Sequence, residues 1–557
     1  MMLLGNINAI PFRRRFGGGG GTPFPNIPGM IVRWSAKGLT NEDMSKNPVW
    51  KDLMGNGYDL QMKNFLWGGM SGVGGYKLNW GDSSIWANYI TQGAGGTGEV
   101  TDNTIHITSA ESNNALFETR ASLKSVEYKV LIKGLTDDIY LRYGVSNDGK
   151  ELWTEIKNDG IYTLPSYDYD SKYNMRWVVM SQTYPIDCNI TIEQLPLYPG
   201  ALVFDGVDDY GVCENFPILT KEKGYTVVAL RQWIEEKNSI AALLSNSKNW
   251  NQDGAFVFEY NNLENNYPNL ELSFGRLTDL GREKSSFTYQ MSKLYNGKEI
   301  KSGEFLGADK LIVAKANENL SPCANVAIWE LVFLDHDATE EELTKIKDYF
   351  VKTYPWLFPD QAWTVTGKTN EDEDRATIAN ITGNGNDLVL SNFGFVEGSG
   401  YNEEGEYAGY LVTDGVDDKV RSSSFTMNED WTIVGDWELL SNVQINCGIV
   451  KAQNVYLYNT ANGLLISINN PRGLQSFGTK SLHAICSDGR LYDRNWVEFE
   501  YTVNQNFEIV KSSLNIGFNL NNYTQIAFKN LGIYNNQILS KDDCIKAYNY
   551  LQTLKAK

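Results

Sequence analysis

The chain has 557 residues, of which 42% are hydrophobic and 21% charged, the balance of a folded rather than a disordered protein. At about 150 residues per domain, that length predicts three or four domains. The formal net charge is −19, so the chain repels the phosphate backbone of DNA or RNA, and we expect no nucleic acid partner. The longest apolar run, 326–334, is too short to span a membrane and contains Glu330, so no membrane insertion is expected.

Residues 1–26 form a predicted N-terminal arm. A secretory signal places positive charge before an apolar stretch, whereas here the apolar residues 1–4 precede the arginines, so no signal peptide is expected. Five glycines, 17–21, make a pliable joint. Because arginine binds carboxylates with a planar fork and stacks on rings, the arm predicts docking to a partner protein; a tail without function is the alternative. The predicted docking residues are Ile10, Pro11, Phe12, Arg13, Arg14, Arg15 and Phe16.

An internal duplication organises the rest of the chain. Three blocks occur twice in the same order: 34–65 returns at 363–393, 205–210 at 414–419, and 327–342 at 527–543. Because the order is kept, the two copies predict two similar domains.

Spacing between the blocks locates an insertion. Phe65 and Asp205 are 140 residues apart, whereas the matching Phe393 and Asp414 are 21 apart, so the first copy carries 119 additional residues. These residues, about 80–198, suffice for a small domain. Apolar and polar residues alternate within it, which predicts strands.

Each copy is predicted to consist of strands followed by one helix. The strand at 202–204 enters a tight turn, where Gly206 and its counterpart Gly415 are free to adopt positive φ. The blocks shared by the copies are all interpreted as strands and turns up to the terminal helices, which begin with the capping-box spacings Thr339 to Glu342 and Ser540 to Asp543. The expected organisation is 1–26 docking arm, 27–79 with 199–354 first sandwich, 80–198 inserted β domain, 355–360 linker and 361–557 second sandwich.

The turn at 204–210, Phe-Asp-Gly-Val-Asp-Asp-Tyr, resembles the signature of concanavalin A-like (laminin-G-like) jelly-roll domains. The second copy keeps Asp-Gly-Val-Asp-Asp but has Thr413 in place of the phenylalanine. The resemblance implies a mainly β fold: tandem concanavalin A-like jelly-roll sandwiches, each with a C-terminal capping helix, plus the inserted small β-sandwich domain. A fold of this kind does not by itself name a ligand.

The arm, with residues 10–16 followed by its glycines, resembles the start of virion proteins of crAss-like phages of gut bacteria, which carry laminin-G-like domains on head fibres and tail appendages. The resemblance implies a virion structural protein, assembled in the host cytoplasm and anchored to other virion proteins through the arm. Homo-oligomers are also expected. Head and tail positions are not distinguished.

The two Asp-Gly-Val-Asp-Asp turns are candidate calcium sites, because carboxylate oxygens suit Ca²⁺. The favoured alternative is that these side chains cap backbone N–H groups of the turns, with no metal and no other cofactor bound. The candidates are Asp205, Asp208, Asp209, Asp414, Asp417 and Asp418.

Tyrosine- and amide-rich loops are candidate glycan-binding sites, because sugars stack on rings and bond to amides. One loop lies in the inserted domain and the other in the first repeat. The candidate residues are Tyr167, Tyr169, Tyr173, Tyr260 and Tyr267. Ordinary surface loops are the alternative.

Catalytic patterns are lacking in the sequence. Acidic runs at 340–342 and 371–374 lie beside a predicted helix start or turns, not on a strand as in sandwich hydrolases, and the three histidines are far apart. Six cysteines without close pairing predict thiols rather than disulfides. We therefore expect no enzyme but a virion protein that presents its sandwiches to host or mucus glycans. A purely architectural component and a polysaccharide depolymerase are the alternatives.

Overall fold

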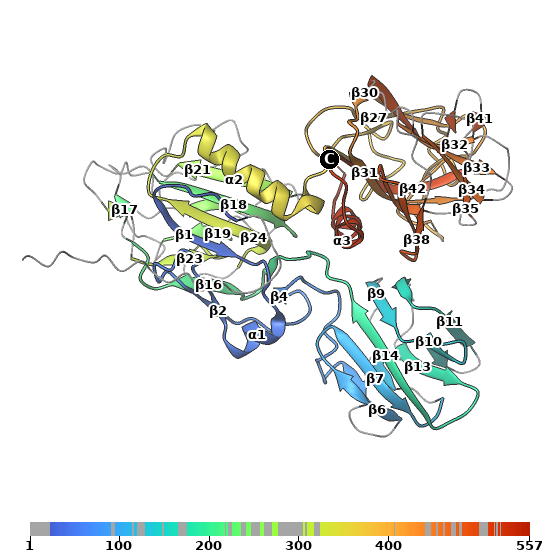
Figure 1. The fold of residues 1–557 in the computed structure, drawn as a ribbon, viewed down its shortest axis with the longest axis horizontal. Coiled ribbons are helices and arrows are strands. Elements are labelled where there is room, and N and C mark those ends of the chain that lie inside the picture. Colours follow the sequence, from blue (N-terminus) through green and yellow to red (C-terminus); the bar gives the residue numbers. More distant parts are fainter. Residues whose placement is uncertain are drawn as a thin grey trace, which may run out of the picture.

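The computed structural model describes residues 23–556 except for 91–94, 114–115, 120–127, 148–149, 165–174, 218, 221–224, 236–240, 247–256, 261–269, 277–304, 307–308, 317–322, 406, 441–446, 453–454, 461–462, 469–474, 478–481, 501–510, 517, 520–521 and 524. Three β lobes make up the molecule, two tandem sandwiches and a domain inserted in the first (Figure 1). The expected mainly β fold is thus confirmed. Among the described residues, no helix is long and apolar enough to cross a membrane.

The first sandwich consists of two six-stranded sheets whose facing sides form one hydrophobic core. Strand β24 is central in one sheet and all ten of its residues are buried, because the second sheet covers one face and a helix covers the other. One sheet has the order β21 (Leu270–Arg276), β18 (Thr226–Trp233), β24 (Asn325–Leu334), β15 (Leu202–Asp205) and β4 (Gly72–Val73), with β1 (Met30–Ser35) also paired to β24. The other has β2 (Val49–Trp50), β3 (Leu60–Lys63), β16 (Tyr210–Cys213), β23 (Leu311–Val313), β19 (Ala242–Ser245) and β20 (Val257–Tyr260), and β17 (Leu219–Thr220) pairs separately with β22 (Phe305–Leu306).

Helix α2 (Glu340–Thr353) lies across the outer face of the first sandwich (Figure 1). Its predicted capping box is present: the Thr339 hydroxyl accepts from the N–H of Glu342, and the Glu342 carboxylate accepts from the N–H of Thr339. The predicted apolar face, Leu343, Ile346 and Phe350, is buried.

A buried ion pair lies between α2 and the sheet. Arg33 on β1 donates from Nε and Nη2 to the two carboxylate oxygens of Glu330 on β24, both at 3.0 Å. The same carboxylate accepts from the hydroxyls of Ser35 and Tyr354, each at 2.8 Å. The Phe24 ring covers the guanidinium at 4.3 Å, so the chain already packs on the sandwich at Phe24, two residues before the expected end of the arm.

The inserted domain is a separate sandwich of two five-stranded sheets around its own core. One sheet has the order β11 (Lys150–Ile156), β10 (Ile139–Asn147), β13 (Met175–Ser181), β8 (Phe117–Thr119) and β5 (Trp86–Asn88). The other has β12 (Gly160–Leu164), β9 (Tyr128–Lys133), β14 (Ile186–Gln194), β7 (Thr104–Ala110) and β6 (Gly96–Val100).

The second sandwich has two eight-stranded sheets. One has the order β28 (Gly400–Tyr401), β29 (Leu411–Val412), β42 (Ile526–Asn535), β31 (Trp431–Leu439), β36 (Leu482–Cys486), β37 (Arg490–Asp493) and β38 (Glu498–Glu500), with β25 (Gln361–Thr364) also on β42. The other has β26 (Thr377–Ile378), β27 (Leu388–Ser391), β30 (Lys419–Thr426), β39 (Lys511–Ile516), β32 (Cys447–Ala452), β33 (Val455–Thr460), β34 (Gly463–Ile468) and β35 (Gln475–Phe477), and β40 (Phe518–Asn519) pairs with β41 (Asn522–Tyr523). The final helix, α3 (Lys541–Gln552), begins at Ser540 as predicted, whose hydroxyl accepts from the N–H of Asp543.

The two copies agree in backbone detail. Gly206 and Gly415 have φ of 75° and 73°, as their turns require. Strands β18 and β31 both carry a register shift against their central neighbour, between Leu230 and Arg231 in the first copy and between Asp436 and Trp437 in the second. One local expectation was wrong: the block at 38–43, interpreted as strand and turn, contains the start of the short helix α1 (Asn41–Lys46), because Thr40 caps the N–H of Asp43.

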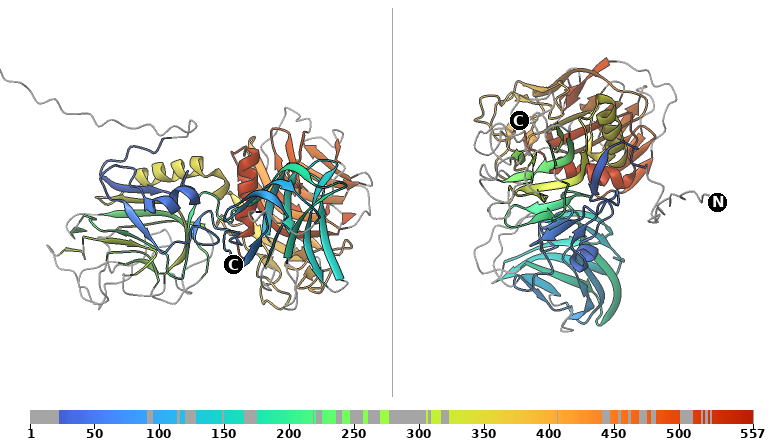
Figure 2. Two further views of the ribbon diagram at one scale, coloured as in Figure 1. Left: turned by 90° about the horizontal axis from the view of Figure 1, so that it is seen from below. Right: turned by 90° about the vertical axis from the view of Figure 1, so that its left-hand side faces the viewer.

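The joint between the sandwiches is buried rather than exposed. The expected linker, 355–360, contains the 3₁₀ helix η3 (Pro355–Leu357), whose Trp356 and Leu357 are buried in a hydrophobic cluster shared by all three lobes. Helix α3 belongs to this cluster and lies on the side of the second sandwich that faces the first (Figures 1 and 2). Apolar contact across the joint therefore holds the lobes together.

Candidate functional site

Most residues predicted from loops fall outside the described parts of the structure. Tyr167, Tyr169, Tyr173 and Tyr267 lie outside the described residues, as do all seven docking residues at 10–16. Tyr260 ends β20, and its side chain is also outside the description. The docking and tyrosine hypotheses therefore stay predictions.

The aspartate turns are described in full in both copies. In the first, the Asp205 carboxylate accepts from the N–H groups of Val207 and Asp208, at 2.7 and 3.4 Å. Asp209 is fully buried and accepts from the Ser71 hydroxyl at 3.0 Å and from the Asp205 N–H at 3.1 Å. These are the backbone caps that the sequence favoured for this turn.

The second copy repeats this network. Asp414 accepts from the N–H groups of Val416 and Asp417, at 2.8 and 3.2 Å. Asp418 accepts from the Ser399 hydroxyl at 3.2 Å and from the Asp414 N–H at 2.8 Å. One carboxylate oxygen from each aspartate of a turn lies within 4.8 Å of the others, and these three oxygens are fewer than the six to eight that Ca²⁺ takes.

Burial changes the acidity of the innermost aspartates. Desolvation, together with the Asp205 charge, raises the pKa of Asp209 to about 8. Desolvation also raises the pKa of Asp418 to about 6, although its backbone and Ser399 hydrogen bonds act in the other direction. Both groups hold a proton more tightly than an exposed aspartate does.

A polar hollow of about 540 Å³ opens on the second sandwich, beside the loop that follows β28. We call it the second hollow. Four exposed glutamates line it together with Phe395, Tyr401 and Asn370. The full lining is Asn370, Glu371, Phe395, Glu397, Tyr401, Glu403, Glu404 and Gly405.

The first sandwich has a hollow of about 500 Å³ at the equivalent place, the first hollow. Asn41, Glu42 and Val73 in it correspond to Asn370, Glu371 and Tyr401 in the second. The inserted domain supplies its other wall. The full lining is Leu39, Thr40, Asn41, Glu42, Ser45, Val73, Tyr76, Thr101, Asp102 and Asn103.

The same asparagine contact builds both hollows. The Asn41 side-chain oxygen accepts from the N–H of Val73 at 2.7 Å, and the Asn370 oxygen accepts from the N–H of Tyr401 at 2.8 Å. The preceding glycines, Gly72 and Gly400, have φ of 142° and 157°, and a Cβ on either would come within 2.5 Å of the asparagine oxygen. Only glycine therefore permits this approach.

The linings suit a ligand rich in hydroxyl groups. Carboxylates and amide oxygens accept hydrogen bonds, hydroxyls and amide N–H groups donate them, and a ring such as Phe395 offers a flat face to sugar C–H groups. The described histidines do not join these hollows: His106 bonds to Asn189 in the inserted domain, His336 contacts Glu342 at the start of α2, and His483 is buried on β36.

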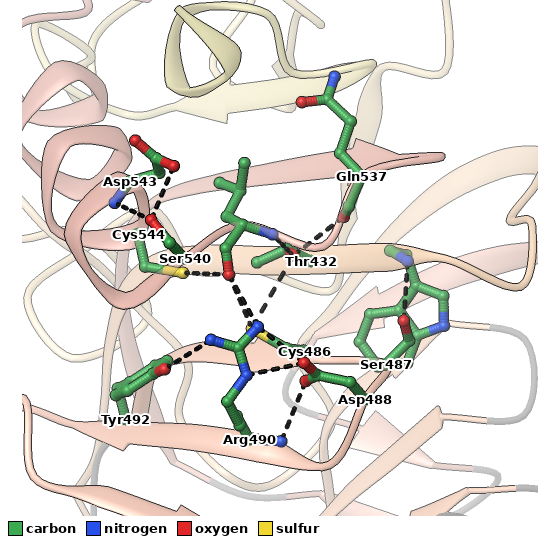
Figure 3. Close-up of polar contacts among 12 residues, drawn as sticks. Thr432, Cys486, Ser487, Asp488, Arg490, Tyr492, Gln537, Ser540, Asp543 and Cys544 are labelled. Atoms are coloured by element: carbon green, nitrogen blue, oxygen red, sulfur yellow. Dashed lines mark hydrogen bonds and ion pairs between the residues drawn. The ribbon is translucent and has the colours of Figure 1, made fainter. Parts of the chain in front are cut away.

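Two cysteines meet beneath α3, as Figure 3 shows. The thiols of Cys486 on β36 and Cys544 on α3 each lie 4.0 Å from the carbonyl oxygen of Leu539. Hydrogen bonding between the thiols lowers the pKa of Cys486 and raises that of Cys544. Arg490 donates to the same carbonyl oxygen at 3.1 Å and to Asp488 at 2.7 Å. The cysteines whose side chains are described are thiols rather than disulfides, as the sequence predicts.

Sequence reasoning missed both hollows. The duplication already aligned Asn41 with Asn370, and a shared asparagine beside a shared acidic residue was the available signal. The walls come from segments distant in the sequence, so no local motif marks them.

No protein-family model matches the chain, and no curated protein matches it. Among solved structures, Trypanosoma rangeli sialidase in complex with sialic acid aligns with 81% of this chain and 82% of its own, at 10% identity and a TM-score of 0.26. The binding domain of botulinum neurotoxin serotype D aligns with 61% of this chain and 88% of its own, at 12% identity and a TM-score of 0.24. A botulinum neurotoxin type C structure, reported for its interaction with two ganglioside molecules, aligns with 59% of this chain and 86% of its own, at 9% identity and a TM-score of 0.20. TM-scores this low do not establish a shared function.

Proposed function

We propose that the chain is a non-enzymatic, glycan-binding structural protein whose two sandwiches each present one polar hollow. The observation that carries this proposal is the equivalence of the hollows: the same asparagine contact and the same glycine build a hydroxyl- and carboxylate-lined site twice. Weak binding of a sugar at one such site is multiplied when several sites engage one surface.

The particle to which the protein belongs is proposed on the sequence alone. The arm's resemblance to virion proteins of crAss-like phages supports a fibre or appendage component, assembled in the host cytoplasm and attached through residues 10–16. Removing residues 1–22 is expected to abolish incorporation into particles while leaving the sandwiches folded, because Phe24, which packs on Arg33 and Tyr349 of the first sandwich, is kept. Shortened protein that still attaches to particles would contradict the docking role.

The glycan proposal is tested with the full chain displayed on beads and applied to neutral polysaccharides and mucin-type glycans. The informative variant carries Glu403→Gln and Glu404→Gln, two exposed residues of the second hollow. Its matched control carries Glu340→Gln and Glu341→Gln, which change the charge equally on the exposed start of α2.

We expect weaker binding from the hollow variant and unchanged binding from the control. If the parent protein bound none of the glycans, the purely architectural alternative would be favoured instead.

The second candidate, a polysaccharide depolymerase, is favoured by one observation, the four glutamates around the second hollow. Hydrolysis needs a carboxylic acid that keeps its proton, which enzymes achieve by shielding it from water, and all four glutamates are exposed. Binding without hydrolysis is therefore proposed. Release of reducing ends from the bead-bound polysaccharide would overturn it.

A further inference from the structure

A third cavity, of about 620 Å³, lies where the three lobes meet, and we call it the lysine cleft. It is lined by residues from the inserted domain, from the first sandwich and from the second sandwich, which contributes α3 and the segment after it. The full lining is Lys77, Tyr128, Lys129, Gln194, Leu195, Pro196, Leu197, Tyr198, Ile234, Glu235, Thr366, Lys529, Asn549, Gln552, Thr553, Leu554 and Lys555.

The lysine cleft carries the opposite charge to the two hollows. Among the described residues, four lysines and one acidic residue, Glu235, line it, whereas those that line each hollow include acidic residues and no lysine or arginine. On a chain of net charge −19, such a cluster of cations is a local exception. Anions are therefore attracted to this cavity and not to the hollows.

Two of the lysines lie against aromatic rings. The Lys129 ammonium lies 3.6 Å from the centre of the Tyr548 ring, and that of Lys529 lies 5.3 Å from the centre of the Tyr410 ring. Asp436, which accepts from the Tyr410 hydroxyl at 3.1 Å, interacts electrostatically with both ammonium groups. The Asp436 carboxylate thus offsets part of the positive charge of these two lysines.

The other two lysines are at the rim. Lys77 and Lys555 are both exposed, one from the segment that leads into the inserted domain and the other from the segment after α3. With Glu235 and Asp436 counted against the four lysines, an excess of positive charge remains. Both rim ammonium groups are therefore open to a ligand that enters from solvent.

One wall of the cleft is apolar. Leu195, Pro196 and Leu197, from the end of the inserted domain, line the cavity together with Ile234 of the first sandwich. The volume lies within the range of small-ligand sites, and an inorganic anion would leave most of it empty. An anion that also has an apolar face, such as a sugar ring bearing a carboxylate or sulfate, fits both the wall and the lysines.

We propose that the lysine cleft binds an anionic saccharide unit, one bearing a carboxylate or sulfate, and that the bound unit ties the three lobes together. This site is separate from the hollows and its ligand differs in charge from theirs. The occupant draws together lysines contributed by different lobes, so binding stabilises their arrangement.

The test uses the full chain with an oligouronate, its carboxyl-reduced neutral counterpart, and inorganic sulfate, each titrated calorimetrically and followed by thermal unfolding. The informative variant carries Lys77→Gln and Lys555→Gln, both exposed, so folding is preserved. The matched control carries Lys37→Gln and Lys347→Gln, two exposed lysines outside the cleft lining.

We expect the oligouronate to bind and to raise the unfolding temperature, and the cleft variant to lose about tenfold in affinity for it while the control keeps that affinity. The neutral counterpart, which the hollows can take, should bind the parent and the cleft variant alike. A neutral counterpart whose binding falls as much in the cleft variant as that of the oligouronate, an equal loss in the control, or no binding of the oligouronate would overturn the proposal. Stabilisation by sulfate as strong as that by the oligouronate would reduce the cleft to a site for simple anions and would also overturn it. None of these results bears on neutral glycans in the hollows, so the two proposals fail independently.

Discussion

The buried pair of Arg33 and Glu330 offers a prediction whose size can be worked out from the structure. The Glu330 side chain is fully buried and that of Arg33 is 12% exposed, so each depends on the other for its charge. Arg33→Met keeps the length of the side chain but leaves a buried carboxylate that retains only the hydroxyls of Ser35 and Tyr354. Loss of one partner of such a pair costs about 3–5 kcal/mol.

The other single change should cost less. Glu330→Gln keeps an oxygen for both hydroxyls, and the guanidinium still donates to the Tyr349 hydroxyl at 2.8 Å and lies against the Phe24 ring. We expect a cost of roughly 2 kcal/mol. With both changes no charge is buried, so the double variant should lose less than the sum of the single variants by about 2–3 kcal/mol.

The second copy supports this reasoning, because it has Ala362 and Asn530 at the positions equivalent to Arg33 and Glu330 and folds as the same sandwich without the pair. The suitable assay is hydrogen–deuterium exchange of the β1 and β24 amides, which reports the opening free energy of this sheet alone. Exchange of β25 and β42 serves as the internal control. Additive costs would show that the two charges do not interact and would refute the argument.

Four further predictions concern other buried groups. Asn530→Val should stabilise β42 by about 1–2 kcal/mol, because both polar atoms of this buried side chain lack hydrogen-bond partners among the described residues, whereas Glu330→Val in the first copy should destabilise the protein. A loss of stability of the Asn530 variant in chemical denaturation would contradict this. The pKa of an unfolded aspartate is near 3.9 and that of folded Asp209 is about 8, so the folded state binds one more proton between these pH values and stability falls as pH rises through this window. Asp209→Asn should remove this pH dependence, and the same dependence of stability on pH in variant and parent would disprove it. Burial lowers the pKa of His483 to about 3, so the neutral ring stabilises the folded state fully above about pH 6.5, and this stability is lost as pH falls toward 3. His483→Phe should reduce the loss of stability in acid, and an unchanged loss would refute the assignment. Mild oxidation should join Cys486 to Cys544, visible as a loss of two hydrogens in the intact mass that Cys544→Ser abolishes; thiols that persist in the parent would contradict their contact.

Local signals in the sequence predicted much of the fold. The caps at Thr339 and Ser540 define both terminal helices, because the residues that satisfy a helix start lie within one turn of it. Comparison of the two copies located the inserted domain, since a length difference between repeats needs no knowledge of strand pairing. The helix at Asn41–Lys46 was missed because its signal, a threonine cap, also suits a turn.

Contacts between distant residues were beyond prediction. In the sequence, Glu330 only interrupts an apolar run, yet in the structure it is the buried partner of Arg33, 297 positions away. The hollows likewise depend on the approach of Asn41 to Val73 and of Asn370 to Tyr401, and β propensity does not specify which strands meet. The lysine cleft needs three lobes in place before its residues are neighbours.

The pairing of β1 with β24 has a consequence for the order in which the protein is made. Strand β1 leaves the ribosome long before its partner β24, which ends at Leu334, and the whole inserted domain is synthesised between them. The inserted domain therefore has all its strands available while the first sandwich still lacks its central one. A nascent chain that stops before Asn325 contains one domain with all the strands of its core, and this is the inserted domain rather than the first sandwich that contains it.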